Sequence, residues 1–126
     1  MAGLTFDTGA LIGLEKRRHR MWKVFDTAVH DRAAITVPTV VLTEWWRGAE
    51  GGKHRDLILR SLRVEPLDEQ TAKLAGVAIG RISGATSVDA VVMASAALRG
   101  DVVYTSDIED LERLRAFFPG VRLLRA

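Results

Sequence analysis

The 126-residue sequence predicts an α/β protein, a three-layer α/β/α sandwich around a mainly parallel central sheet. Three observations indicate this class. Short strand-like segments alternate with segments of helical periodicity, an order typical of parallel sheets covered on both faces. No internal repeat, low-complexity segment or linker divides the chain. The length suits one domain, so we expect a single domain over residues 1–126.

The expected strands are short runs rich in Val, Ile, Leu, Phe and Tyr, bounded by turn-forming or charged residues. They are residues 3–6, 33–38, 63–67, 101–106 and 121–124. Pro38 is expected to end the second strand, because proline has no N–H to donate to a sheet.

Seven segments have the apolar periodicity or the caps of helices. They are residues 8–15, 21–30, 39–49, 54–62, 68–82, 88–99 and 107–118. Ala10, Leu11 and Leu14 share one face of the first helix. Thr39 and Asp68 stand where N-terminal caps are expected for the third and fifth helices.

The helices differ in their expected exposure. The basic run KRRHR, residues 16–20, breaks the helical pattern and is expected to be a solvated connection. Residues 88–99 are apolar nearly all round, which predicts a buried helix, and Gly100 is expected to stop it.

Composition excludes several kinds of site. The chain has no Cys, which excludes disulfides, thiol catalysis and cysteine zinc sites, and its three His are too scattered for a zinc site. No apolar run is long enough to cross a bilayer, and no signal-peptide pattern is present. We therefore expect no membrane contact and a cytoplasmic location.

Arginine dominates the basic residues, with 14 Arg among 18 Lys plus Arg, although the net charge is only +2. Arginine binds phosphate bidentately and stacks on bases, whereas lysine acts more as a point charge. The bias permits a nucleic-acid partner. The arginine codons of a GC-rich genome explain it equally well.

Aspartates follow two of the expected strands. Asp7 comes directly after residues 3–6, and Asp107 follows residues 101–106. If both strands are central and parallel, the two carboxylates emerge at the edge of the sheet where ligands bind. Each has an alternative role as a helix cap, with Asp110 as the capping partner of Asp107. Asp89, in the first turn of the buried helix, has the alternative of complementing the helix dipole.

Glu44 lies within an apolar segment, VVLTEWWRG. By helical spacing it shares a face with Val40, Val41 and Gly48, where a carboxylate is unusual. Its local alternative is a surface ion pair with Arg47, one turn later.

Convergence of these four carboxylates would require a counter-ion. Two unit charges about 4 Å apart repel by about 4 kcal/mol at an effective dielectric of 20. The acids would then either hold protons or bind a cation, and an all-oxygen ligand set selects Mg²⁺ or Mn²⁺. Such a centre favours hydrolysis of phosphodiesters.

Four motifs resemble those of PIN-domain proteins, and most of all the VapC-type toxins of toxin–antitoxin pairs. They are LTFDTGALIGL, PTVVLTEWWRG, SVDAVVMASAAL and VVYTSDIEDLERL. The resemblance covers nearly the whole chain. It implies a PIN-like fold and a Mg²⁺-dependent endoribonuclease, with Mn²⁺ as a substitute, that cuts RNA such as tRNA or rRNA.

The resemblance also implies site residues. The acids Asp7, Glu44, Asp89 and Asp107 match the family's catalytic and metal-binding cluster, with Asp7 and Asp89 as its most direct ligands. Asp110 matches an acid found in part of the family, so it shares or exchanges the fourth role with Asp107. Further matches are the hydroxyl-bearing residues Thr105 and Ser106, which are expected to orient a carboxylate or a water.

The partners implied are a VapB-like antitoxin protein that covers the active groove, an RNA substrate, and a second copy of the chain in a homodimer. Trp45 and Trp46 lie about 100° apart on a helix, so one of them is expected in the core. The other, with Arg47 beside it, is expected at the antitoxin groove or on an RNA base, and the groove is favoured. The KRRHR run and scattered arginines are candidates for contacts with the RNA backbone, with a solvated loop as the alternative.

Two other readings of the acids remain open. The first is a non-catalytic module whose acidic pocket only caps helices or holds a structural ion. The second is a phosphatase or receiver-like α/β domain, which also places an aspartate after its first strand. A phosphatase of that kind has a second aspartate where this chain has Gly9, and none of the four Lys fits its lysine. A nucleotide-binding site is excluded because no glycine-rich phosphate loop is present.

Overall fold

A five-stranded parallel sheet forms the centre of the protein, in the order β3-β2-β1-β4-β5. The computed structural model describes residues 3–126, so Met1 and Ala2 of the expected domain lie outside the described residues. The strands are β1 (Leu4–Phe6), β2 (Ile35–Pro38), β3 (Arg63–Glu65), β4 (Val102–Thr105) and β5 (Arg122–Arg125). Because every neighbouring pair is parallel, all carboxyl ends lie along one edge.

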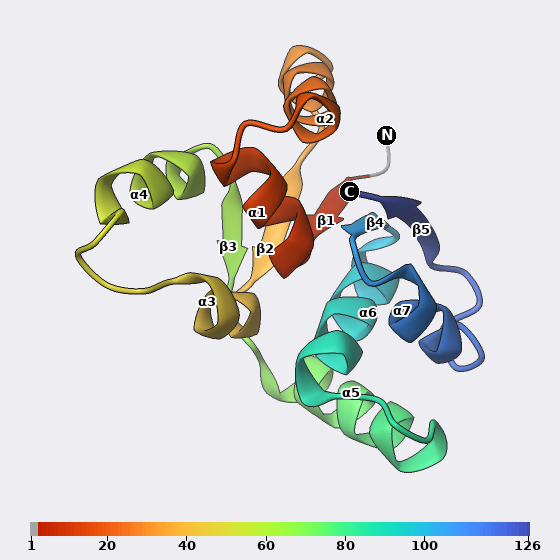
Figure 1. Ribbon diagram of the computed structural model, residues 1–126. Helices are drawn as coiled ribbons and strands as arrows, with labels where there is room; N and C mark the ends of the chain where they lie inside the picture. Colours follow the sequence, from red (N-terminus) through yellow and green to blue (C-terminus); the bar gives the residue numbers. More distant parts are fainter. Residues whose placement is uncertain (1–2) are drawn as a thin grey trace.

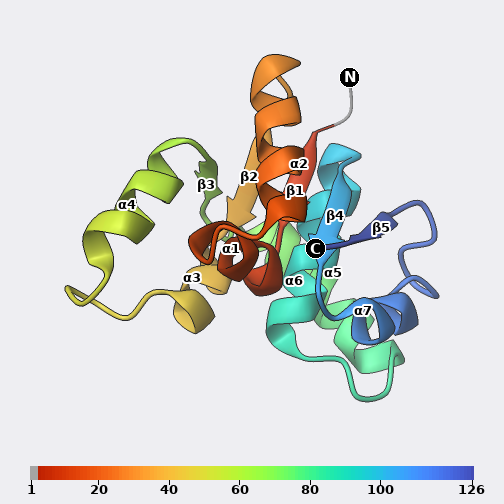
Figure 2. The same ribbon diagram turned by 45° about the horizontal axis from the view of Figure 1, so that its top comes forward.

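Helices cover both faces of the sheet, which confirms the expected three-layer α/β/α class. They are α1 (Thr8–Glu15), α2 (His19–His30), α3 (Thr39–Trp45), α4 (Gly52–Arg60), α5 (Glu69–Arg81), α6 (Ser87–Arg99) and α7 (Ile108–Leu114). Figures 1 and 2 both place α1 and α2 on the opposite side of the sheet from α5 and α6. In the described residues, no helix combines the length and the apolar character needed to cross a membrane.

The core lies against β1, which has neighbours on both sides, and against the two helices that flank it. Phe6 of β1 and Leu11 of α1 are fully buried, as is Met93 of α6. The expectation for α6 is confirmed, since seven consecutive residues, 90–96, are buried in it. Gly100 ends α6 with a φ of 75°, a left-handed conformation that costs glycine little.

Three local predictions are wrong. Helix α2 begins at His19, so part of the KRRHR run is helical, although all five of its residues are exposed as expected. Thr39 does not cap α3; Pro38 occupies the cap position, and the Thr39 hydroxyl accepts a hydrogen bond from the N–H of Leu67 instead (3.2 Å). Helix α3 ends at Trp45 and not near residue 49.

Helix α7 is also shorter than expected. It ends at Leu114, four residues before the predicted end, and the chain then turns. Pro119 disfavours a helical conformation at the residue before it. The guanidinium of Arg115 also donates to the carbonyl of Val121 (2.9 Å), which ties the turn to the start of β5. The cap predicted at Asp68 is confirmed: its carboxylate accepts from the N–H of Thr71 (2.8 Å).

Candidate active site

Asp7 stands at the junction of β1 and α1. It is only 5% exposed, and its Oδ1 accepts a hydrogen bond from the N–H of Ala10 (3.1 Å). Asp7 is therefore an N-terminal cap, as the alternative reading proposed. The cap role does not exclude a second one, because a carboxylate has further lone pairs and this one lies at the carboxyl edge of the sheet.

Thr105, the last residue of β4, connects two of the predicted acids. Its buried hydroxyl accepts a hydrogen bond from the N–H of Asp107 (2.9 Å) and donates one to the Asp7 carboxylate. One side chain thus orients Asp7 directly and Asp107 through its backbone.

Asp107 does not act as a helix cap. It occupies the cap position of α7, but its exposed side chain makes no capping hydrogen bond. Its proposed capping partner, Asp110, instead accepts from the guanidinium of Arg113 (2.8 Å). The capping alternative is therefore wrong for Asp107, whose carboxylate is left for another role.

Asp89 is half-buried in the first turn of α6. The cap of this helix is Thr86, whose hydroxyl accepts from the N–H of Asp89 (3.2 Å). Burial raises the pKa of Asp89, and a hydrogen bond with Thr86 opposes the rise. Nearby Asp107, Asp110 and Glu44 raise this pKa further, so they lie within electrostatic reach of Asp89.

Glu44 is exposed near the end of α3, and its Oε1 accepts from the hydroxyl of Thr8 (2.6 Å). This bond brings it to the first residue of α1, beside Asp7. The ion pair with Arg47, which was the alternative role for Glu44, does not form. The Arg47 guanidinium donates to the carbonyl oxygens of Glu44 (2.8 Å) and Trp46 (2.8 Å). Sequence analysis missed the contact of Thr8 with Glu44. The one feature that could have indicated Thr8 as a site residue is its position directly after Asp7.

The pKa of Asp7 shows the electrostatic state of this edge. Burial raises it from 3.8 to about 6, against the opposing hydrogen bonds from Thr105 and Ala10. The negative charges of Asp107 and Asp89 make smaller contributions to this same rise. Three aspartates from three different elements therefore act on one another at the carboxyl edge of β1 and β4.

These acids have no cationic partner among the residues that the structure describes. Across residues 3–126, none of Asp7, Glu44, Asp89 and Asp107 forms an ion pair. In the same described part, no three His, Asp or Glu side chains are arranged to hold a metal ion. The cluster is thus uncompensated, and its side chains are not grouped as a closed ligand set.

Ser106 packs against the start of α1. A Cβ added to Gly9 would lie 1.9 Å from the Ser106 Oγ, so position 9 has no space for a larger side chain. A phosphatase of the haloacid-dehalogenase kind has an aspartate at this position. The close approach of Ser106 therefore gives a steric reason against that alternative.

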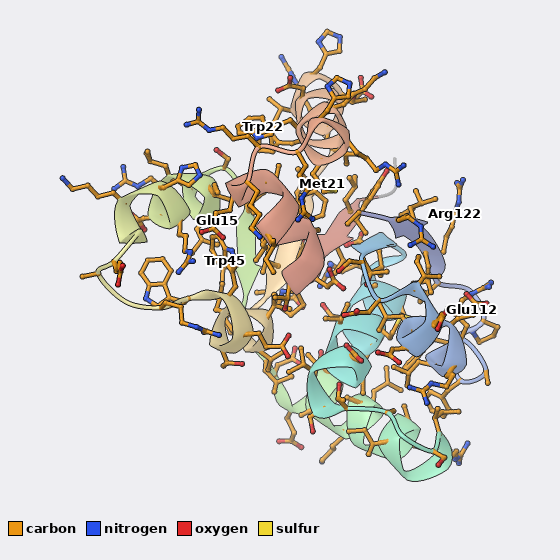
Figure 3. All side chains as sticks on the ribbon, viewed as in Figure 1. Glu15, Met21, Trp22, Trp45, Glu112 and Arg122 are labelled. Carbon is orange, nitrogen blue, oxygen red and sulfur yellow. The ribbon has the colours of Figure 1, made fainter. Side chains whose placement is uncertain are left out.

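The two adjacent tryptophans separate as expected. Trp45 is buried, and its Nε1 donates to Glu15 (3.1 Å), the residue that it faces in Figure 3. It is the core tryptophan. Trp46 is 38% exposed and lies beyond the end of α3. It lines a shallow hollow together with Leu42, Thr43 and Leu59.

Several solved structures have the same fold. VapBC2 from Rickettsia felis, bound to a promoter DNA fragment, matches with a TM-score of 0.80 and 13% identity over 98% of each chain. DNA-bound VapBC from Salmonella typhimurium matches with a TM-score of 0.77 and 20% identity, over 99% of this chain and 98% of that chain. FitAcB from Neisseria gonorrhoeae matches with a TM-score of 0.68 and 18% identity over 96% of each chain.

At these identities the likeness concerns the fold. No curated protein sequence matches this one significantly. The PIN domain family, however, matches residues 4–116, from β1 to the turn after α7. This match spans most of the sequence, and the chain therefore belongs to the PIN domain family.

Proposed function

We propose that this protein is a metal-dependent endoribonuclease and the toxin of a VapBC-type toxin–antitoxin pair. PIN domains are generally nucleases. The substrate proposed is RNA, of the tRNA or rRNA class, and the reaction is hydrolysis of a phosphodiester bond. The observation that carries this proposal is the uncompensated cluster of Asp7, Asp89 and Asp107 at the carboxyl edge of the sheet.

The donor set fits a hard divalent cation. It consists of carboxylate and hydroxyl oxygens, with no sulfur or imidazole, which favours Mg²⁺ with Mn²⁺ as a substitute. Such an ion would polarise the phosphodiester and lower the pKa of a bound water. The raised pKa of Asp7 supports this fit, because a buried carboxylate beside other carboxylates is stabilised by a cation.

The acidic residues of the chain would have different roles at the metal ion. Asp7 and Asp89 would hold the ion most directly, with Glu44 and Asp107 completing the set. Thr105 keeps the Asp7 carboxylate oriented. Since Asp110 is engaged by Arg113 and Asp107 is not paired, we assign the fourth role to Asp107.

Thr8 and Ser106 would position neighbouring groups. Thr8 holds the Glu44 carboxylate through its hydroxyl (2.6 Å). Ser106 packs on Gly9 and so sets the distance between the start of α1 and the end of β4. Neither residue is assigned a chemical step.

The protein partner proposed is a VapB-like antitoxin. The solved structures that share this fold include VapBC toxin–antitoxin complexes. Exposed Trp46 lines a shallow hollow with Leu42 and Thr43, which precede Glu44 in α3. The partner would seat an apolar side chain in this hollow. A second copy of this chain is the other expected partner, and sedimentation measures it directly.

The function is tested with Asp7→Asn, using Asp68→Asn as a matched control. Both aspartates cap helices by accepting an N–H three residues on, and Asn preserves most of a cap's effect. Purified proteins are incubated with structured RNA in Mn²⁺, in Mg²⁺ and in EDTA. We expect cleavage by the wild type and by Asp68→Asn in either metal, and a loss of about 1,000-fold or more in Asp7→Asn.

The contrary outcomes are specific. Equal cleavage by the two variants would mean that Asp7 is a cap only. Cleavage that persists in EDTA would contradict metal dependence. No cleavage of any RNA at several metal concentrations would favour the non-catalytic binding module.

A further inference from the structure

A small hollow of about 190 Å³ opens beside the acidic cluster, between the start of α7 and the end of β5. Its lining residues are Ser106, Asp107, Ile108, Glu109, Asp110 and Arg125. Three of them are acids, and within the described part of the chain Arg125 is the one basic residue that lines it. The hollow therefore has both an acidic wall shared with the proposed catalytic centre and a single guanidinium.

Sheet register places Arg125 at this edge. It is the last residue of β5 and pairs with Thr105, the last residue of β4. The N–H of Ala126 donates to the carbonyl of Thr105 (2.9 Å), which holds the two strand ends together. Arg125 thus lies one strand away from the residue that orients Asp7, and beside Asp107.

Other arginines near this edge are already engaged. The guanidinium of Arg113 is held by Asp110, and that of Arg47 by carbonyl oxygens at the end of α3. Arg125 is exposed and, among residues 3–126, forms no ion pair. It does not pair even with the carboxylates that line the same hollow. Its charge is therefore available to an anion from outside.

We propose that Arg125 binds a backbone phosphate of the RNA strand next to the acidic cluster. This inference rests on the proposed function, because the cluster supplies the reason for RNA to lie here. The acidic wall repels phosphate, and Arg125 supplies the local positive charge that offsets this repulsion. Its planar guanidinium can grip two phosphate oxygens at once, which fixes the position of the strand as well as attracting it.

The test compares two arginines of the same strand. Arg122 begins β5 (Figure 3), is exposed, and lies at the amino edge of the sheet, opposite to the carboxyl edge where Asp7 and Asp107 stand. Arg125→Ala, Arg125→Lys and Arg122→Ala are each made in the Asp7→Asn background. Binding of a fluorescent single-stranded RNA is measured by anisotropy in Mg²⁺ from 50 to 300 mM salt. The same substitutions in the wild-type background give KM and kcat for cleavage.

We expect Arg125→Ala to weaken RNA binding about three- to tenfold at low salt. The plot of log Kd against log salt should become shallower by about 0.7, the effect of one phosphate contact on a single strand. Arg125→Lys should keep the slope but not the full affinity, since lysine is a point charge. Arg122→Ala should match its parent, and in cleavage the change should appear mainly in KM.

Three results would overturn the inference. Equal effects of Arg125→Ala and Arg122→Ala would reduce Arg125 to a general surface charge, and no RNA binding by the parent would remove its ligand. If Arg125 only neutralised the acids, Arg125→Ala would tighten Mn²⁺ binding in calorimetry and leave the salt slope unchanged. Loss of binding in Arg125→Ala with no cleavage by the wild type would contradict the nuclease and keep the phosphate site.

Discussion

Two buried aspartates beside the central strands have opposite surroundings. Asp101 precedes β4 and is 7% exposed, while Asp7 follows β1 and is 5% exposed. Asp101 accepts from the Arg99 guanidinium (2.9 Å) and from the Thr5 hydroxyl (2.8 Å). Asp7 accepts hydrogen bonds from an N–H and a hydroxyl but forms no ion pair with any residue from Gly3 to Ala126. The two sites bury similar charges and compensate them differently.

The Asp101 site is complete within the protein. Arg99 also pairs with Glu65 (2.7 Å) and donates to Thr5 (2.7 Å) and Ser95, so one guanidinium joins β1, β3, β4 and α6. The Asp7 site gathers carboxylates without such a residue. A buried carboxylate that pairs with an arginine of the same chain helps to hold the fold together. A buried carboxylate without such a partner is stabilised only by a proton or by a bound cation. This difference separates a structural cluster from a candidate active site.

Removal of Arg99 should have the largest effect on stability. Arg99→Ala leaves buried Asp101 and half-buried Glu65 without their cation, and removing the partner of a buried carboxylate costs up to about 3–5 kcal/mol. The control is Arg113→Ala, which breaks an exposed pair with Asp110 and should cost less than about 1 kcal/mol. Urea unfolding measures both. Similar losses in the two variants would show that the Arg99 cluster is no different from a surface pair.

Asp7 should make the free energy of unfolding fall as pH rises, whereas a salt-bridged acid makes it rise. The pKa of Asp7 is about 6 in the folded protein and near 3.8 in the unfolded chain. The folded state therefore binds the proton more tightly, and stability is lost as pH rises from about 4 to about 6. One pKa unit corresponds to about 1.4 kcal/mol, so the loss is at most about 3 kcal/mol.

A bound divalent cation should restore the stability that is lost when Asp7 ionises. At pH 7.5 the carboxylates are ionised, so millimolar Mg²⁺ should raise the urea midpoint in the wild type and have little effect at pH 4. The Asp7→Asn variant serves as the reference, because the difference between its profile and that of the wild type isolates the contribution of Asp7. A wild-type profile in EDTA that coincides with that of Asp7→Asn would contradict the raised pKa.

The layout of the fold is predictable from the sequence because its signals are local. The central strands are short apolar runs and most helices have an apolar period, so the alternation predicts parallel strands with a shared carboxyl edge. The errors arise where tertiary contacts decide. Thr39 looks like a cap but bonds to the N–H of Leu67, and α7 stops early where Arg115 reaches Val121.

The candidate site is predictable in position and less so in detail. Asp7 and Asp107 are placed by the strands that precede them. The bond between Thr8 and Glu44 joins residues 36 positions apart, and no local pattern indicates it. The hydrogen bonds from Arg47 to carbonyl oxygens depend on where α3 ends. The sequence predicts that end about one turn too late, so these bonds are not predicted.

The smallest expected effect tests how the acidic site is held together. Thr105→Val removes the hydroxyl between the Asp7 carboxylate and the N–H of Asp107. Because that hydroxyl lowers the pKa of Asp7, its loss should raise this pKa, move the acid limb of the pH–rate profile upward, and reduce kcat about tenfold at neutral pH. Thr105→Ser keeps the hydroxyl and should restore most of the rate. If serine and valine give the same profile, Thr105 acts through packing alone, and its hydrogen bond to the Asp7 carboxylate has no catalytic role.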